Sequence, residues 1–226
     1  LGDTGIPRHG RTGKWKFYYE NGQLKLELTY KDGQLNGPFK SYHDNGQLKE
    51  EGTYKDGKND GLWKTYYENG QLESEGTYKN GKADGPYKIY HEIGQLRVEG
   101  TNKDGQLNGL YKSYYENGQL EEEGTYKDNK RDGPWKRYHE NGSLKWEINY
   151  IDGKPDGMVQ VFYDNGNLDY SQQYKAGLKV GMYQSYYENG NKSWLYFFNE
   201  EGNRDSLRAL TRWREDGTLW YEGFTK

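Results

Sequence analysis

Residues 61–80 read GLWKTYYENGQLESEGTYKN, and variants of this stretch recur along the chain at one fixed spacing. Two series of glycines, the first beginning at Gly13 and the second at Gly22, keep a step of 24 residues without interruption. Self-similarity at such a period marks a repeat architecture, in which each unit buries its surface against its neighbours. The chain is therefore expected to hold eight successive units, in residues 13–198.

Each unit has the pattern of a β-hairpin. The pair Asn69-Gly70 separates two runs rich in aromatic and β-forming residues. Asn-Gly between such runs is typical of a two-residue type I′ turn, in which both residues need positive φ. A helix is a poor alternative, because glycines interrupt every apolar stripe at helical spacing.

A two-residue loop sets the register of the two strands. In the first unit it places Lys16 opposite Glu27 and Tyr19 opposite Leu24. The Lys–Glu pair recurs at Lys40–Glu51, Lys64–Glu75, Lys88–Glu99, Lys112–Glu123 and Lys136–Glu147. In the last two units both members change together, to Gln160–Ser171 and Gln184–Leu195. Opposite charges across a strand pair contribute about 0.2–1 kcal/mol, so the paired change supports this register.

Side chains alternate along a strand, so the register separates two faces. The packed face, here called the ring face, carries a large ring at Trp15, Phe39, Trp63, Tyr87, Tyr111, Trp135 and Tyr183, and a second row of Tyr or His. The other face, here called the charge face, carries the Lys–Glu pairs and a recurring tyrosine such as Tyr66. Because Gly76 lies opposite Trp63, we expect the ring to lie flat on bare backbone and Gly76→Val to crowd it.

The composition agrees with a repeat built on aromatic rings. The 226 residues include 32 Gly and 24 Tyr, and 16% are aromatic although only 31% are hydrophobic, which favours a quasi-one-dimensional core. The net charge is −3 with acids and bases interspersed, which argues against a nucleic-acid partner. There is no cysteine for a disulfide or a thiolate metal site. No run approaches the roughly 18 apolar residues of a transmembrane segment.

These observations predict an all-β repeat protein. Tandem 24-residue β-hairpins would form an extended, twisted antiparallel meander, as a single-sheet ribbon or solenoid, with polar linkers such as residues 55–61 between hairpins. We expect residues 1–12 to form an N-terminal tail, residues 13–198 the eight repeats, and residues 199–226 a C-terminal capping hairpin.

A cap is expected because a bare end strand would invite pairing with another chain. Within it, Asp216-Gly217 has the pattern of a turn that would set Trp213 opposite Trp220. Residues 206–213 fit a strand, with a short helical turn as the alternative.

Written as EGTYKDGKNDGLWKTYYENGQLESEGTY, the unit resembles the MORN family, and best its bacterial "MORN repeat variant" branch, whose members show a similar G-x-W/Y-x-x-Y-Y-x-N-G-x-L-x-x-E-G-x-Y pattern. The likeness covers residues 13–198, with departures at Val159, Gln172 and residues 192–198. It implies stacked hairpins in an extended sheet that serves as a protein-interaction or scaffolding surface, with no activity and no cofactor of its own. Some MORN proteins are linked to membrane phospholipids, and some bacterial members carry an antitoxin-like label.

The residues themselves predict neither a catalytic nor a metal site. Catalysis needs unlike groups that converge, whereas each candidate here is repeated at equivalent positions. His43, His91 and His139 are 48 residues apart, about 20 Å along the sheet. They are too far apart to share a metal and stand where other units have Tyr. The linker acids Asp56 and Asp60 lack the dense alternating acids of a calcium loop.

Two binding hypotheses remain. The first is a protein-interaction module with regularly spaced aromatic anchors. The second is a carbohydrate, cell-wall or choline-type binder, in which rings stack on sugars or cage a quaternary amine. Association with phospholipid headgroups is a lesser alternative. The candidate binding residues are Trp63, Tyr87, Tyr111, Trp135, Tyr67, His91, Tyr115 and His139 on the ring face, and Tyr66, Tyr90 and Tyr114 on the charge face.

The expected partner is another protein, with a glycan or a cell-wall polymer as the alternative, and the chain is expected to be a monomer or an edge-paired dimer. The chain begins with Leu1 and not with Met. This favours a processed or truncated start and a bacterial envelope or secreted location, with the cytoplasm as the alternative.

Overall fold

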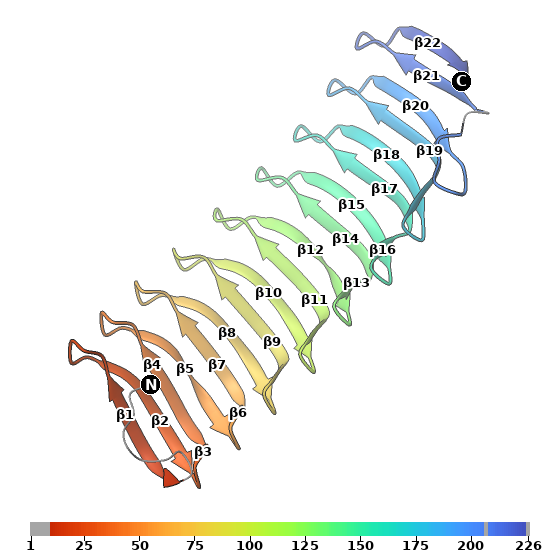
Figure 1. Cartoon of the computed structure of the whole chain (residues 1–226). Coiled ribbons are helices and arrows are strands. Elements are labelled where there is room, and N and C mark those ends of the chain that lie inside the picture. The colour runs from red at the N-terminus through yellow and green to blue at the C-terminus, as the bar shows by residue number, and fades with distance from the viewer. Residues whose placement is uncertain (1–9, 206–207, 225–226) are drawn as a thin grey trace. The chain divides into compact units, whose positions relative to one another are not determined.

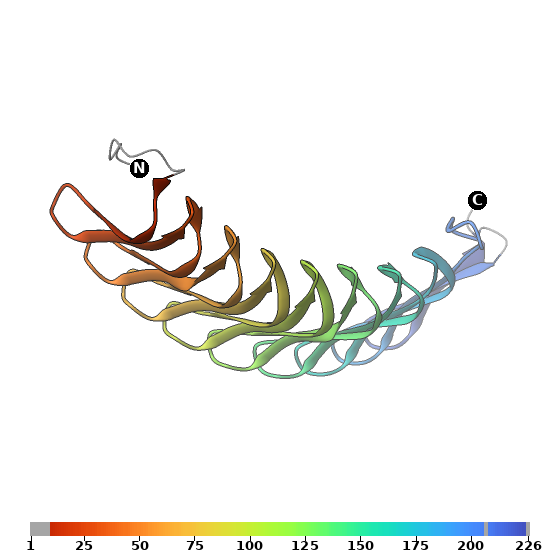
Figure 2. The ribbon, with the colours of Figure 1, turned by 90° about the horizontal axis from the view of Figure 1, so that it is seen from below.

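The computed structural model describes residues 10–205 and 208–224. In this part of the chain 22 strands pair in antiparallel fashion, and there is no α-helix. The prediction of an all-β meander of hairpins is confirmed (Figure 1). The chain divides into two compact units, Leu1–Leu107 and Asn108–Lys226. Figure 2 shows the successive hairpins of each unit one behind the other, with bent strands.

The first unit holds β1 (Gly13–Tyr18), β2 (Leu24–Lys31), β3 (Gln34–Leu35), β4 (Gly37–Tyr42), β5 (Leu48–Lys55), β6 (Lys58–Asn59), β7 (Gly61–Tyr66), β8 (Leu72–Lys79), β9 (Lys82–Tyr90) and β10 (Leu96–Lys103). β11 (Gln106–Tyr114) begins at the boundary. The second unit continues with β12 (Leu120–Lys127), β13 (Lys130–Arg131), β14 (Gly133–Tyr138), β15 (Leu144–Ile151), β16 (Lys154–Pro155), β17 (Gly157–Phe162), β18 (Leu168–Lys175), β19 (Leu178–Tyr186), β20 (Lys192–Phe198), β21 (Ala209–Trp213) and β22 (Leu219–Phe224).

The predicted register is confirmed in the body of each of the eight hairpins. Every expected pair is found: Lys16–Glu27, Lys40–Glu51, Lys64–Glu75, Lys88–Glu99, Lys112–Glu123, Lys136–Glu147, Gln160–Ser171 and Gln184–Leu195. Five of the Lys–Glu pairs form ion pairs, with N–O distances from 2.8 to 3.7 Å. The cross-strand charges therefore do lie on one face of the sheet.

The Asn-Gly loops, however, are not type I′ turns. In the first hairpin the Gly22 amide donates to the Tyr19 carbonyl (3.0 Å), and the Tyr19 amide donates to the Gln23 carbonyl (2.8 Å). Within the loop Glu20-Asn21-Gly22 only the glycine has positive φ, at 83°. This is the three-residue loop that ends in a glycine bulge. Asn21 serves it by accepting the Gln23 amide on its side-chain oxygen (3.0 Å).

The longer loop changes the pairing next to the turn. Leu24 lies opposite Tyr18, so the predicted pair with Tyr19 is wrong. A bulge between Phe17 and Tyr18 then takes up the extra residue, and Phe17 faces Leu26 in the predicted register. The same irregularity occurs in all eight hairpins. The loop was predicted one residue too short, and the bulge restores the register.

Two-residue turns with positive φ at both positions lie in the linkers instead. Asp56 (φ 50°) and Gly57 (φ 75°) join β5 to β6, as the type I′ geometry requires. The Gly57 amide donates to the Leu35 carbonyl in the preceding linker (2.8 Å). Equivalent bonds recur at Gly33, Gly81, Gly105, Gly153 and Gly177. The linkers are therefore tied to one another as well as to their own strands.

At the C-terminal end, β21 and β22 form a hairpin. Its loop repeats the three-residue form, with the Gly217 amide donating to the Arg214 carbonyl (2.9 Å). Trp213 consequently faces Leu219, and its predicted pairing with Trp220 is wrong. Of the segment 206–213, residues 209–213 are strand, whereas residues 206 and 207, like most of the predicted tail, lie outside the described residues.

Candidate binding groove on the ring face

The rings of the second and third hairpins pack against one another on the ring face. Phe39 and Trp63 are stacked, with centroids 5.4 Å apart and an angle of 19°. Tyr54 meets both edge-on, at 5.5 and 5.1 Å. Trp63 and Phe39 are buried and form a core with Leu28. Most of this face is therefore occupied by its own side chains, as in the interior of a domain.

The second unit repeats this arrangement. Tyr111 and Trp135 lie 5.7 Å apart, and Tyr126 meets both edge-on, at 5.4 and 4.9 Å. Trp135 is fully buried. Of the ring-face candidates, Trp135 is thus inaccessible to a partner, and Tyr111 is half-buried.

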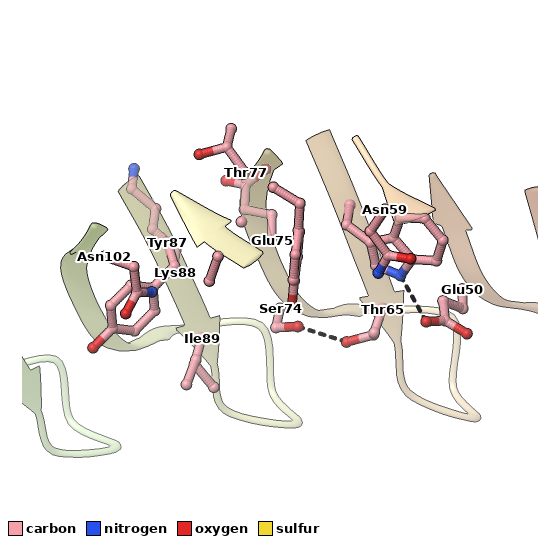
Figure 3. Close-up of a pocket in the computed structure, with 14 residues that line it drawn as sticks. Glu50, Asn59, Thr65, Ser74, Glu75, Thr77, Tyr87, Lys88, Ile89 and Asn102 are labelled. Carbon is pink, nitrogen blue, oxygen red and sulfur yellow. Dashed lines mark hydrogen bonds between the residues drawn. The ribbon is translucent and has the colours of Figure 1, made fainter. Parts of the chain in front are cut away.

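The row opens between Trp63 and Tyr87, where a groove of about 300 Å³ lies over Gly76 (Figure 3). Its lining includes Trp63, Tyr78 and Tyr87 as well as the small or polar side chains of Asn59 and Ser74. All of its residues belong to the first unit. This groove offers both aromatic walls and empty space.

The groove exists because the two flanking rings lean away from Gly76. A Cβ built on Gly52 would collide with the six-membered ring of Trp63, so the indole covers the preceding hairpin. A Cβ on Gly100 would lie 2.8 Å from the Tyr87 ring, so Tyr87 covers its own hairpin. On Gly76 a Cβ would meet only the Tyr87 Cβ and Cα, at 3.3 and 3.9 Å. The expectation that Trp63 covers Gly76 is therefore wrong.

A replacement in the sequence accounts for the position of Tyr87. Tyr54, Tyr78, Tyr126 and Tyr150 close their hairpins at equivalent positions, whereas Asn102 stands there in the hairpin of Tyr87. A phenol that would meet Tyr87 edge-on is missing at this position. Figure 3 shows the Tyr87 ring beside Asn102. The smaller side chain leaves the room into which Tyr87 turns, and the groove opens behind it.

The Tyr and His side chains of the second ring-face row form hydrogen bonds to the backbone of the next hairpin. The Tyr67 and Tyr115 hydroxyls donate to the carbonyls of Tyr90 and Tyr138 in the next hairpin, at 2.7 and 2.8 Å. The Nε2 atom of His139 bonds the Phe162 carbonyl at 3.0 Å in the same way. His43 does likewise with Tyr66 (2.9 Å), and His91, half-buried, occupies the same position in its unit. The histidine thus replaces a tyrosine as a structural donor.

The charge-face candidates are also engaged. The hydroxyl of Tyr66 donates to Glu51 (2.8 Å) and that of Tyr90 to Glu75 (3.1 Å). Burial, followed by the bond to Glu51, raises the pKa of Tyr66 to about 12. Tyr114 is half-buried. The lysines of this face lie next to glutamates, which reduces their field. These tyrosines therefore do not offer open ring faces in a row.

The described residues hold neither a metal-binding cluster nor a membrane-spanning helix. Within residues 10–205 and 208–224, no three His, Asp or Glu side chains come together as a metal site would need. In the same part of the chain, none of the elements is a helix that could cross a membrane.

The groove contains a group that sequence reasoning missed. The carboxylate of Glu50 accepts the indole N–H of Trp63, with 2.6 Å from Nε1 to Oε1 (dashed in Figure 3). Thr65 and Ser74 share a hydrogen bond of 2.7 Å beside it. Aligning the repeats would have shown the acid Glu50 in the second unit. Its meaning depends on the position of the indole.

Comparison with known proteins identifies the repeat. The family model described as "MORN repeat variant" matches residues 11–32, 35–56, 59–80, 107–128, 131–152 and 155–176, more than half of the chain. The unmatched stretch between the third and fourth segments includes Tyr87 and Asn102, which line the groove. No curated protein sequence matches significantly.

Similar solved structures include the crystal structures of TcdB2-TccC3-Cdc42 and TcdB2-TccC3, with TM-scores of 0.23 and 0.22 and identities of 11% and 12%. The alignments cover 88% and 93% of this chain but only 13% and 15% of those chains.

Proposed function

Because the chain belongs to the MORN repeat variant family, whose repeats are generally non-catalytic, we propose that it is a binding scaffold that recognises another protein through its ring face. The partner would dock at the groove between Trp63 and Tyr87. The observation that carries this proposal is a groove with aromatic walls and a bare glycine floor.

The shape of the groove favours a protein ligand. Its floor is the uncovered backbone of Gly76, onto which a partner's side chain could pack closely. Its walls, Trp63 and Tyr87, are residue types that dominate the energy of protein interfaces. Polar groups of Glu50 and Asn59 at the side would orient the incoming group. Such a combination suits one anchoring side chain of a partner.

Filling the groove tests this function. Gly76→Val would place a branched side chain on the floor, where a Cβ meets only the backbone-proximal atoms of Tyr87. We expect the folded chain to lose its partner in pull-downs from the source cells, as identified by quantitative mass spectrometry. Leu110→Thr, which changes a side chain that is 71% exposed in the second unit, is the matched control.

The carbohydrate hypothesis is decided in the same experiment. If the wild-type chain is retained on an immobilised glycan or wall-polymer panel, captures no protein, and loses glycan retention on Gly76→Val, the groove binds sugars and the proposal is wrong. Equal capture of the protein partner by wild type and Gly76→Val would remove the groove from the interface.

A further inference from the structure

The linker before the sixth hairpin, β14–β15, shows which side chain can fill such a groove. The guanidinium of Arg131 lies 4.2 Å from the centroid of Trp135. Its Nη2 atom forms an ion pair with Glu122 at 2.7 Å, and its Nη1 atom donates to the Tyr150 hydroxyl at 3.3 Å. Trp146 flanks it at 5.7 Å. The cation is thus sandwiched between rings and neutralised by one carboxylate.

The groove between Trp63 and Tyr87 has equivalents of this indole, carboxylate and phenol, but no equivalent of the cation. Three periods earlier, 72 residues, Trp63 stands for Trp135, Glu50 for Glu122 and Tyr78 for Tyr150. Asn59 stands for Arg131, and Ser74 stands for Trp146. All five side chains line the groove. The aromatic base, the carboxylate and the flanking phenol are kept, while the two large groups that filled the space are replaced by small ones.

The hydrogen bonds of the two indoles agree with this comparison. Where the arginine is present, the Trp135 indole N–H donates to the Thr125 carbonyl (3.0 Å) and the carboxylate is left to Arg131. Where it is absent, the Trp63 indole N–H donates to the Glu50 carboxylate (2.6 Å). Among the described residues no cation forms an ion pair with Glu50. Figure 3 shows Asn59 beside this bond.

Glu50 differs from the other acid at its repeat position. A cation occupies the linker position at Arg11, Arg131 and Lys179; Arg11 lies 5.0 Å from the centroid of Trp15. The position nine residues before the linker position is acidic only at Glu50 and Glu122 among the repeats. Glu50 is therefore the one such acid whose own linker, at Asn59, brings no positive charge.

We propose that the groove receives an arginine side chain of the protein partner, an inference that rests on the proposed function. The guanidinium would stack on Trp63, bond the Glu50 carboxylate and lie beside Tyr78, as Arg131 does in its own site. Planarity and several N–H donors suit this site to arginine. Lysine would bring charge without the flat surface. A choline-type ammonium would bring charge without an N–H donor.

The test follows the indole N–H resonance of Trp63 in the isotope-labelled full chain during titration with the capped peptide acetyl-Gly-Gly-Arg-Gly-Gly-amide. We expect a saturable shift, because the guanidinium takes over the carboxylate that holds this N–H. The citrulline analogue, equal in shape but uncharged, should bind about tenfold more weakly or worse. The lysine peptide and choline should also bind more weakly than the arginine peptide.

Two variants complete the test. Glu50→Gln should abolish the preference for arginine over citrulline. Asn59→Arg should fill the groove from within, block the peptide and raise the denaturation midpoint. Pro155→Arg is the matched control, because it has the same linker position, lies outside the groove, and has Trp146 and no carboxylate nine positions earlier.

No shift with the arginine peptide at about 20 mM, the range of a single weak contact, would overturn the inference. Equal shifts with citrulline or choline would do the same. If the cellular partner is still lost on Gly76→Val while the arginine peptide fails, the scaffold proposal stands and only the chemistry of the anchor is wrong. If Gly76→Val retains the partner, the docking place itself is wrong.

Discussion

Trp63 covers the backbone of Gly52, one hairpin earlier, although Gly76 is its partner across the strands. Gly52→Val should therefore displace the indole and lower the free energy of unfolding by about 1–3 kcal/mol, the usual cost of overpacking. Urea unfolding followed by tryptophan fluorescence measures this. Gly76→Val serves as the control in the same strand position of the next hairpin and should change stability by much less. Equal losses in both variants would contradict the placement of the ring.

The Tyr–His row makes a prediction about hydrogen bonds between hairpins. Tyr67→Phe removes the hydroxyl that donates to the Tyr90 carbonyl and should cost about 1 kcal/mol in urea unfolding. Tyr67→His should cost less, because the imidazoles of His43 and His139 make the equivalent bond from Nε2. A histidine variant less stable than the phenylalanine variant would mean that the ring's packing, and not its donor, matters here.

Ala176 occupies a linker turn with φ of 51°, a region that costs an L-residue with a Cβ roughly 1 kcal/mol. Ala176→Asn should stabilise the second unit by up to about that amount, because Asn tolerates this conformation and appears at the equivalent position as Asn80. Thermal or urea unfolding measures the gain. Asp104→Asn, at the equivalent turn three periods earlier, should be nearly neutral. A destabilised Ala176→Asn would show that the turn is not strained.

Tyr66 predicts how stability depends on alkaline pH. Its pKa in the folded chain is raised from 10 to about 12, by burial first and by the Glu51 bond second. Below pH 10 the Tyr66 phenol is protonated in both the folded and the unfolded chain, and its contribution to the free energy of unfolding is fully present. Between pH 10 and 12 the unfolded phenol ionises first, so the folded state holds more protons and stability falls as pH rises. Urea midpoints across this window should fall less steeply with pH in Tyr66→Phe than in the wild-type chain, and equal slopes would contradict the role of Tyr66.

Much of the fold could be predicted because every repeat tests the same strand register again. Lys64 and Glu75 had to face each other if charges pair across strands, and they do. The turns could not be assigned equally well, because Asn-Gly suits both a type I′ turn and a three-residue loop that ends in a glycine bulge. The hydrogen bond that the Gln71 amide donates to the side-chain oxygen of Asn69 (2.9 Å) favours the second.

The candidate groove was beyond the sequence pattern for a different reason. The pattern identifies Trp63 and Tyr87 as equivalent rings, but their tilts differ, since each depends on what its neighbours leave empty. Asn102 stands where most other hairpins have a tyrosine, and Asn59 stands where a later linker has Arg131. Both smaller side chains line the groove. Reading the departures from the repeat, and not the repeat itself, would have pointed to this place. The choice among the eleven candidate residues needs coordinates because most of them are engaged within the array.

The bonds that join neighbouring hairpins span set intervals: 22 residues from Gly57 to Leu35 and 23 from Asn69 to Glu92. At the last junction Tyr187 reaches Trp213, 26 residues on, and the added length lies between β20 and β21. Insertions or deletions of whole 24-residue repeats therefore keep these bonds. Extra residues can also be inserted in a connection outside the paired strands, as between β20 and β21. The loss of a single codon inside a strand would put that hairpin out of register with its neighbours, while the hairpins beyond it would keep their spacing to one another.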